Sequence, residues 1–125
     1  MTGKEILEKY PNSKKLMLEW IGTNMKYDSS KKDISEEFKK YIEENMFSLL
    51  ETTIDNNPRN LFTFFDQSNL IINTPLISSD NISFKYTINN DYYDSTLYEN
   101  RILSEKAAIM QSIILLEENL NKKIN

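Results

Sequence analysis

The stretch Ile82-Ser83-Phe84-Lys85-Tyr86-Thr87-Ile88-Asn89-Asn90 decides the fold of this chain. Over its first seven residues, large apolar side chains alternate strictly with small or polar ones. This alternation predicts an antiparallel strand with one face in the core. Asparagine tolerates positive φ angles, so the two asparagines predict a type I′ turn. The stretch therefore predicts a β-hairpin in the second half of the chain.

This turn fixes the register of the strand that follows it. Tyr86 then lies opposite Tyr93, and Ile82 lies opposite Leu97. Such cross-strand pairs stabilise a sheet, which predicts a third strand over residues 91–98.

An apolar segment precedes the hairpin. Leu70-Ile71-Ile72 and Leu76-Ile77 flank Pro75, which has no N–H to donate to a neighbouring strand. The segment therefore predicts an edge strand, and the three strands together predict an antiparallel meander.

One long helix is predicted after the strands, over residues 101–122, with Asn100 as its cap. The alternative is a helix that begins earlier, capped by Thr96 with Glu99, and we favour the strand in that region. The long helix has two apolar stripes, Ile102, Ile109, Ile113, Leu116 and Leu120 on one side and Leu103, Ala107, Met110 and Ile114 on the other. This apolar face is too wide for a simple surface helix. The helix either crosses the sheet beneath the N-terminal helices or offers its second stripe to a partner.

The first 66 residues predict helices. Thr2 and Glu5 have the spacing of a capping box, and the short helix that they begin ends at Pro11. Asn12 or Ser13 is the predicted cap of a second helix that reaches about residue 27.

A third helix is predicted from Asp33, which forms a capping box with Glu36, to about Asp55. Its apolar residues follow the helical period and predict the buried face: Ile34, Phe38, Tyr41, Ile42, Leu49 and Ile54. Pro58 suits the first position of a further short helical turn.

These elements predict an α+β fold in a single domain over residues 1–125. A helical half, residues 1–66, precedes a βββα half, residues 67–125, and the last helix packs on the three-stranded antiparallel meander.

The composition excludes several kinds of chemistry. The 125 residues contain no histidine, no cysteine and only two glycines, Gly3 and Gly22. Catalysis by Ser/His/Asp or Cys/His groups and ligation of zinc or haem by histidine or cysteine are excluded, and the glycines lack the spacing of a phosphate-binding loop. Asp80, Asp91 and Asp94 are the densest carboxylates, but they lack the spacing of a calcium loop. We predict a protein that is not an enzyme and needs no metal or cofactor.

The net charge of −4 is unevenly distributed. Residues 1–32 carry seven lysines against four acids, whereas residues 33–55 carry seven acids against two lysines. Acidic surfaces attract basic partners, and tyrosines are enriched at binding hot spots. The candidate partner-binding residues are Glu36, Glu37, Glu43, Glu44, Tyr92 and Tyr98. Only the basic N-terminal third suits phosphate, and the candidate RNA contacts there are Lys14, Lys15, Lys26, Lys31 and Lys32. The alternative for both charged sets is a solvated surface without a partner.

The chain contains the segments Thr2-Gly3-Lys4-Glu5-Ile6-Leu7-Glu8-Lys9-Tyr10-Pro11, Asn57-Pro58-Arg59, Phe65-Asp66 and Glu105-Lys106-Ala107-Ala108-Ile109. These segments resemble small uncharacterised proteins encoded by phages of Bacteroidota. The resemblance implies a phage origin, the cytoplasm of the bacterial host as location, and inhibition of host defence, as anti-CRISPR proteins achieve it. The implied partner is a bacterial defence protein such as an RNA-guided CRISPR nuclease or its RNA-bound complex.

The order of three strands followed by a helix resembles the double-stranded-RNA-binding domain. This resemblance implies a small RNA-binding accessory module as the alternative function. That family begins its last helix with a lysine cluster, whereas this chain has Ser104-Glu105-Lys106. The glycines expected in the third strand are absent as well.

Neither membrane contact nor self-association is expected. The longest apolar run, Ile113-Ile114-Leu115-Leu116, is far shorter than the roughly 20 residues that span a bilayer. We expect a monomer rather than a homodimer, because the helix over residues 33–55 needs the surface of the last helix. In a homodimer, the contact would form from Leu103, Met110 and Ile114.

Overall fold

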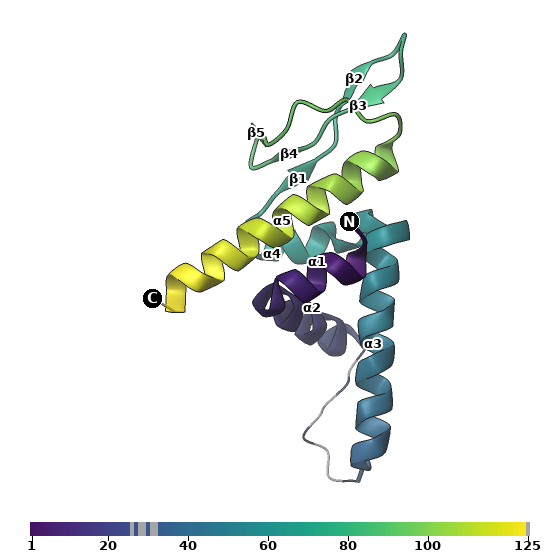
Figure 1. Cartoon of the computed structure of the whole chain (residues 1–125), viewed down its shortest axis with the longest axis vertical. Coiled ribbons are helices and arrows are strands. Elements are labelled where there is room, and N and C mark those ends of the chain that lie inside the picture. The colour runs from purple at the N-terminus through teal and green to yellow at the C-terminus, as the bar shows by residue number, and fades with distance from the viewer. Residues whose placement is uncertain (26, 28–29, 31–32, 125) are drawn as a thin grey trace.

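Helices and short strands make up the α+β fold of the computed structural model, which describes residues 1–25, 27, 30 and 33–124 (Figure 1). The helices α1 (Gly3–Lys9), α2 (Pro11–Asn24), α3 (Glu36–Asn56), η1 (Pro58–Leu61) and α4 (Phe62–Gln67) come first. The strands β1 (Ile72–Asn73), β2 (Leu76–Ser78), β3 (Ser83–Phe84), β4 (Thr87–Ile88) and β5 (Asp91–Tyr92) follow, and then α5 (Arg101–Ile124). The first sheet is antiparallel in the order β1-β4-β5, and β2 pairs with β3 in a second sheet.

The long helix α5 lies between the helices and the strands. It contacts η1, α2 and α3 on one side and β3 and β4 on the other (Figure 1). Ile109, Ile113 and Leu116 are buried in an apolar cluster to which every helix, β1 and β4 contribute. The prediction of a long C-terminal helix packed on a three-stranded antiparallel sheet is confirmed.

The second stripe of α5 is covered less completely than the first. Ala107, Met110 and Ile114 are half-buried against the core cluster. At the start of the helix, Ile102 and Leu103 are about half exposed, because α5 extends there beyond the helices that cover its middle. The exposure of Ile102 shows that the first stripe is not buried over its whole length.

Two helix starts follow the local capping rules. Thr2 and Glu5 form the predicted capping box of α1, with both side chains bonded to backbone N–H groups. Asn100 Oδ1 accepts a hydrogen bond of 2.9 Å from the N–H of Leu103, so the predicted cap of α5 is also confirmed.

The start of α2 is organised by a residue far away in the sequence. The helix begins at Pro11, directly after α1, and the prediction that Asn12 or Ser13 caps it is wrong. Instead, Glu117 of α5 reaches this helix end, and its Oε1 accepts a hydrogen bond of 2.8 Å from the buried N–H of Ser13. Glu117 Oε2 accepts a second bond of 2.8 Å from the side chain of Asn12. A carboxylate at a helix N-terminus satisfies its free donors and interacts favourably with its dipole.

The start and the buried face of α3 differ from the prediction. Ser35 rather than Asp33 caps the helix, and Ser35 Oγ accepts a hydrogen bond of 3.1 Å from a backbone N–H in the first turn. The buried residues repeat every four positions, at Met46, Leu50 and Ile54. Only this face meets α1, α2 and η1, so the predicted stripe is partly wrong, and three of its members are at least half exposed: Phe38, Tyr41 and Leu49.

The first two predicted strands form one antiparallel hairpin that is interrupted in its middle. Ile72 pairs with Ile88, and the same register continues to Leu76, which pairs with Phe84. Between these pairs lies Pro75, which has no N–H to donate, so each predicted strand is divided into two short ones. This interruption separates the two sheets.

The predicted turn is confirmed, because Asn89 and Asn90 have φ angles of 53° and 70°. The predicted third strand over residues 91–98 is wrong beyond Tyr92. Asp94 Oδ1 accepts a hydrogen bond of 3.0 Å from the N–H of Thr96, a local turn that directs the chain away from the sheet. The alternative helix capped by Thr96 is not formed either.

This early end of β5 changes the pairing beyond it. The chain returns to the sheet only at Tyr98, which forms an isolated bridge with Phe84. The predicted pair of Ile82 and Leu97 is therefore absent from the described structure, and both side chains are more than half exposed.

Candidate functional site

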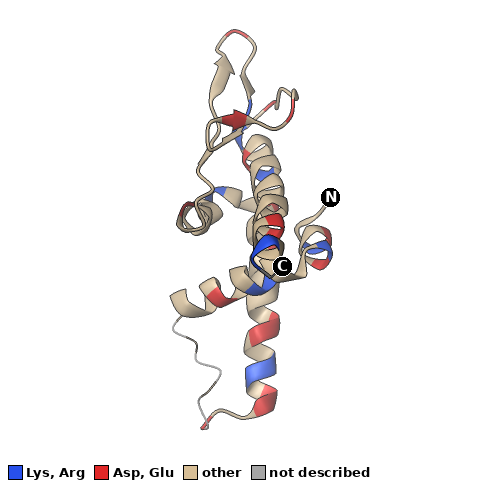
Figure 2. Cartoon of the chain, turned by 90° about the vertical axis from the view of Figure 1, so that its left-hand side faces the viewer, with Lys and Arg blue, Asp and Glu red and all other residues tan. Residues whose placement is uncertain are grey.

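The N-terminal half of α3 projects from the molecule at the end opposite the β2–β3 hairpin (Figures 1 and 2). Phe38 and Tyr41 lie on the outer face of this projecting half, and Leu49 lies on the same face further along α3; their exposed fractions are 52%, 62% and 50%. Their spacing places them on one side of a helix with 3.6 residues per turn. The rings of Phe38 and Tyr41 are stacked, with centroids 6.3 Å apart and planes 23° apart. We call these three residues the outer stripe.

The four glutamates predicted to bind a partner lie on two sides of α3. Glu37 and Glu44 are exposed, two turns apart, and lie along one edge of the outer stripe, beside Tyr41. Glu36 is paired with a lysine one turn further along, at 3.3 Å. Glu43 accepts a hydrogen bond of 3.3 Å from the hydroxyl of Tyr27. Two of the four predicted glutamates are therefore placed to act with the outer stripe.

The tyrosines predicted to join this surface lie elsewhere. Tyr92 belongs to β5 and Tyr98 precedes α5, at the end of the molecule away from the projecting half of α3 (Figure 1). Tyr98 is half-buried, and its hydroxyl donates a hydrogen bond of 2.8 Å to Asp94. The prediction therefore combined residues from two distant surfaces.

Burial and one carboxylate change the acidity of two neighbouring tyrosines. The rings of Tyr86 and Tyr98 lie 6.3 Å apart in a tilted contact. Burial, followed by the hydrogen bond to Asp94, raises the pKa of Tyr98 to about 12. Burial, followed by the negative charge of Asp94, raises the pKa of Tyr86 well above its usual range. Both phenols stay protonated at neutral pH, and Tyr98 anchors the loop before α5.

The lysines predicted to contact RNA are only partly described. Lys14 and Lys15 both lie on α2, where the Lys14 ammonium is 4.1 Å from the ring centroid of Phe47 and Lys15 is exposed. The other three predicted contacts lie outside the described residues: Lys26, Lys31 and Lys32.

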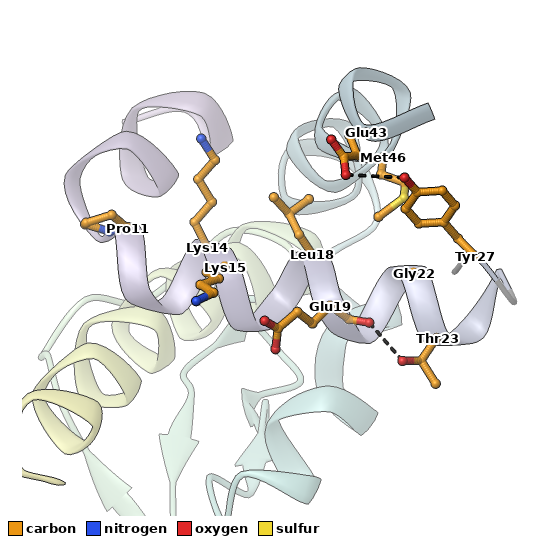
Figure 3. A pocket seen from close by; sticks show the side chains of 10 residues that line it. All are labelled: Pro11, Lys14, Lys15, Leu18, Glu19, Gly22, Thr23, Tyr27, Glu43 and Met46. Atoms are coloured by element: carbon orange, nitrogen blue, oxygen red, sulfur yellow. Dashed lines mark hydrogen bonds between the residues drawn. The ribbon is translucent and has the colours of Figure 1, made fainter. Parts of the chain in front are cut away.

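A groove of about 600 Å³ is lined by residues of α2 and α3 (Figure 3). Leu18 and Met46 provide its apolar lining, Lys14 lies towards one end, and Tyr27 and Glu43 lie at the other. The groove can accept an elongated group with an apolar middle and charged ends. Met46 belongs to the buried face of α3, so the groove and the outer stripe are separate surfaces.

The sequence interpretation assigned the outer stripe to the core. Apolar residues at helical spacing predict burial, but α3 carries a second apolar set at Met46, Leu50 and Ile54. A helix at the side of a small protein buries one face. The presence of two apolar faces on one helix was the signal that a surface was available for binding.

Two further questions concern metals and membranes. In the described part of the chain, no group of three or more acidic side chains is placed to hold a metal ion. None of the described helices combines the length and the apolar content that crossing a bilayer requires.

Comparison with known proteins adds no further assignment, because no family model, curated protein or solved structure matches the chain.

Proposed function

We propose that this chain is a non-enzymatic binding protein whose projecting helix α3 docks on a basic surface of a partner protein and blocks it. The observation that carries the proposal is the stacked, exposed pair of Phe38 and Tyr41 on a part of the helix that projects from the molecule. Exposed aromatic residues that gather on one surface are typical of protein-binding sites. Leu49 extends the apolar contact along the same face.

The charges beside the outer stripe indicate the kind of partner. Glu37 and Glu44 border the aromatic pair along one side, which gives an apolar stripe with one acidic edge. An amphipathic helix with this arrangement fits an apolar groove that has a basic edge. Acidic edges also accelerate association with basic clefts through long-range attraction.

The resemblance to phage proteins makes an RNA-guided nuclease of the host bacterium the first partner to test. Such nucleases hold nucleic acid in basic channels, and a helix with an acidic edge is complementary to a surface of that charge. Docking of α3 there would compete with the nucleic acid. The experiment measures cleavage of target DNA by the purified nuclease with increasing amounts of the chain.

The expected result is loss of cleavage at near-equimolar chain, and loss of that inhibition in the double variant Phe38→Ser/Tyr41→Ser. Truncation of hot-spot residues costs about 2 kcal/mol or more, so the dissociation constant should rise about 30-fold or more. Ile82→Ser is the matched control, because Ile82 is an apolar residue with an exposed fraction of 66% in the turn between β2 and β3, and that hairpin lies at the opposite end of the molecule (Figure 1). If the double variant Phe38→Ser/Tyr41→Ser inhibits the nuclease as strongly as Ile82→Ser does, the proposed role of α3 is contradicted.

The alternative function is an RNA-binding module that uses the lysines of α2. A pull-down from host lysate, with and without nuclease treatment, distinguishes this alternative from the inhibitor. Recovery of one stoichiometric protein after nuclease treatment, lost with Phe38→Ser/Tyr41→Ser, supports the inhibitor. Recovery of RNA alone, lost with Lys14→Gln/Lys15→Gln, supports the alternative and contradicts the inhibitor.

A further inference from the structure

The sheet end of the molecule contains a polar depression that no sequence pattern indicated. It is open, has a volume of about 720 Å³, and lies where η1, the strands and the start of α5 meet. Among the described residues that line it, two are arginines and none is acidic. The lining residues that matter for its chemistry are Arg59, Asn73, Asn90, Tyr92 and Arg101.

The two arginines are the only ones in the sequence, which otherwise uses lysine for its positive charges. They are far apart in the chain, since Arg59 belongs to η1 and Arg101 begins α5, yet they line the same depression. A guanidinium group presents several N–H donors in a planar fork that matches phosphate and carboxylate oxygens. The fold therefore concentrates its best anion-binding groups in one place.

Arg59 is held in position by a buried carboxylate. Its Nε donates a hydrogen bond of 3.1 Å to Glu105 Oε1, and the Glu105 side chain is only 5% exposed. The Arg59 guanidinium also lies 5.4 Å from the ring centroid of Phe62. Its side chain is 59% exposed, so the donors on the Nη atoms remain accessible from the depression.

Arg101 is oriented by an aromatic ring and keeps its charge unpaired. Its guanidinium lies 5.0 Å from the ring centroid of Phe84, and no carboxylate of the described residues forms an ion pair with it. Arg101 is the first residue of a long helix, where the helix dipole also favours an anion.

The remaining lining groups distinguish a nucleotide from a simple anion. Tyr92 is 57% exposed, and its ring already has the Lys85 ammonium 5.3 Å from its centroid. An exposed aromatic ring beside cations is the usual platform for stacking a base. Asn73 and Asn90 add amide groups that both donate and accept hydrogen bonds, as base edges require. Asp91 precedes Tyr92 in β5, and successive side chains of a strand point to opposite faces. The Asp91 carboxylate is therefore on the face of β5 opposite to Tyr92.

From these groups we infer that the depression binds a nucleotide unit, with its phosphate between Arg59 and Arg101 and its base against Tyr92. The unit is either a free nucleotide or part of a single strand, because both present the same phosphate and base. This site is separate from the lysines of α2 and from the outer stripe, so it stands or fails independently of the proposed inhibition.

The experiment is an NMR titration of the ¹⁵N-labelled chain with inorganic phosphate, with UMP and with the single-stranded hexanucleotide U₆. All three probes should shift the amides of residues 59, 73, 90, 92 and 101. UMP should bind at least about five-fold more tightly than phosphate, since stacking of one base has that effect or a larger one. Tighter binding of U₆ than of UMP identifies a strand as the ligand, and equal binding identifies a free nucleotide.

Variants locate the site. Arg101→Gln should weaken binding of every probe about ten-fold or more, because a charge-assisted contact is lost. Tyr92→Leu should weaken UMP but not phosphate. The matched control is Lys15→Gln, which removes an exposed positive charge on α2 and should leave all three affinities unchanged. The amide spectrum of each variant serves as the check that the variant is folded.

Three results would overturn the inference. The first is the absence of amide shifts at these positions with all three probes at millimolar concentration. The second is UMP binding no tighter than phosphate, which removes the base from the site. The third is an equal loss of affinity in Lys15→Gln and Arg101→Gln, because the ligand would then bind through non-specific attraction to positive charge.

Discussion

Replacement of Glu117 by alanine should destabilise the protein far more than a surface carboxylate would. The Glu117 side chain joins α5 to the start of α2, where it accepts bonds of 2.8 Å from the Ser13 N–H and from the Asn12 side chain. Ser13 is fully buried, so water has no access to its N–H once the carboxylate is gone. Glu117→Ala therefore leaves a helix end without a cap and a buried donor without an acceptor.

The magnitude follows from these two losses. Loss of a helix cap costs about 0.5–2 kcal/mol, and a buried unsatisfied donor costs about 1–3 kcal/mol. Both figures describe the same hydrogen bond in part, so we expect a decrease of about 2–3 kcal/mol in the free energy of unfolding. For a chain of this length, that decrease lowers the melting temperature by about 8–12 °C. Glu117→Gln keeps one acceptor oxygen and should cost about 1 kcal/mol.

Urea denaturation followed by far-UV circular dichroism measures this change. The matched control is Glu118→Ala, which removes an exposed carboxylate from the next position of α5 and should stay within about 0.5 kcal/mol of the wild type. Equal stabilities of Glu117→Ala and Glu118→Ala would refute the reasoning, because the carboxylate would then not act as the cap of α2.

Four further predictions follow from the fold. Phe84→Ala should lower the free energy of unfolding by about 3–5 kcal/mol in the same denaturation assay, because Phe84 is buried. Ile82→Ala should leave it almost unchanged, because Ile82 belongs to the same alternating pattern but is exposed. Folded Tyr98 keeps its proton up to a pKa of about 12, while an unfolded tyrosine loses it near 10.0, so stability should fall as the pH rises between these values, and less steeply in Tyr98→Phe. Asn90→Gly should preserve stability and Asn90→Ala should lower the free energy of unfolding by about 1 kcal/mol, because glycine and asparagine tolerate the φ angle of 70° and alanine does not. Light scattering should give the monomer mass of 14.8 kDa, in which case Met110→Glu should destabilise the fold by placing a carboxylate against the core, whereas a mass of about 30 kDa would contradict the monomer.

The parts of the fold that depend on neighbouring residues could be predicted from the sequence. The capping box of Thr2 and Glu5 and the turn at Asn89-Asn90 involve groups only a few residues apart, and both are confirmed. The cap of α2 could not be predicted, because Ser13 and Glu117 are separated by 104 positions in the sequence.

It could not be predicted either which members of an apolar pattern are buried, because this depends on where the neighbouring helices and strands end. Ile82 and Phe84 belong to the same alternating pattern, yet only Phe84 lies against the helix that covers the sheet. Phe38 and Ile54 likewise belong to one predicted stripe of α3, but the helices that cover Ile54 do not extend as far as Phe38. For the candidate site, residue type drew attention to the charged residues of α3, whereas the exposed aromatic pair is found only once the structure shows which face of α3 is left uncovered.

The position of α5 after the helical half and the strands has a consequence for biosynthesis. Its polar side chains bond to the sheet through Ser104, to η1 through Glu105, to α3 through Lys106 and to α2 through Glu117. A ribosome adds about 5–20 residues per second, so the helical half waits on the order of several seconds for this partner. During that interval the apolar faces of α1 to α4 are exposed, and a chaperone that binds such surfaces would meet the nascent chain before α5 completes the core.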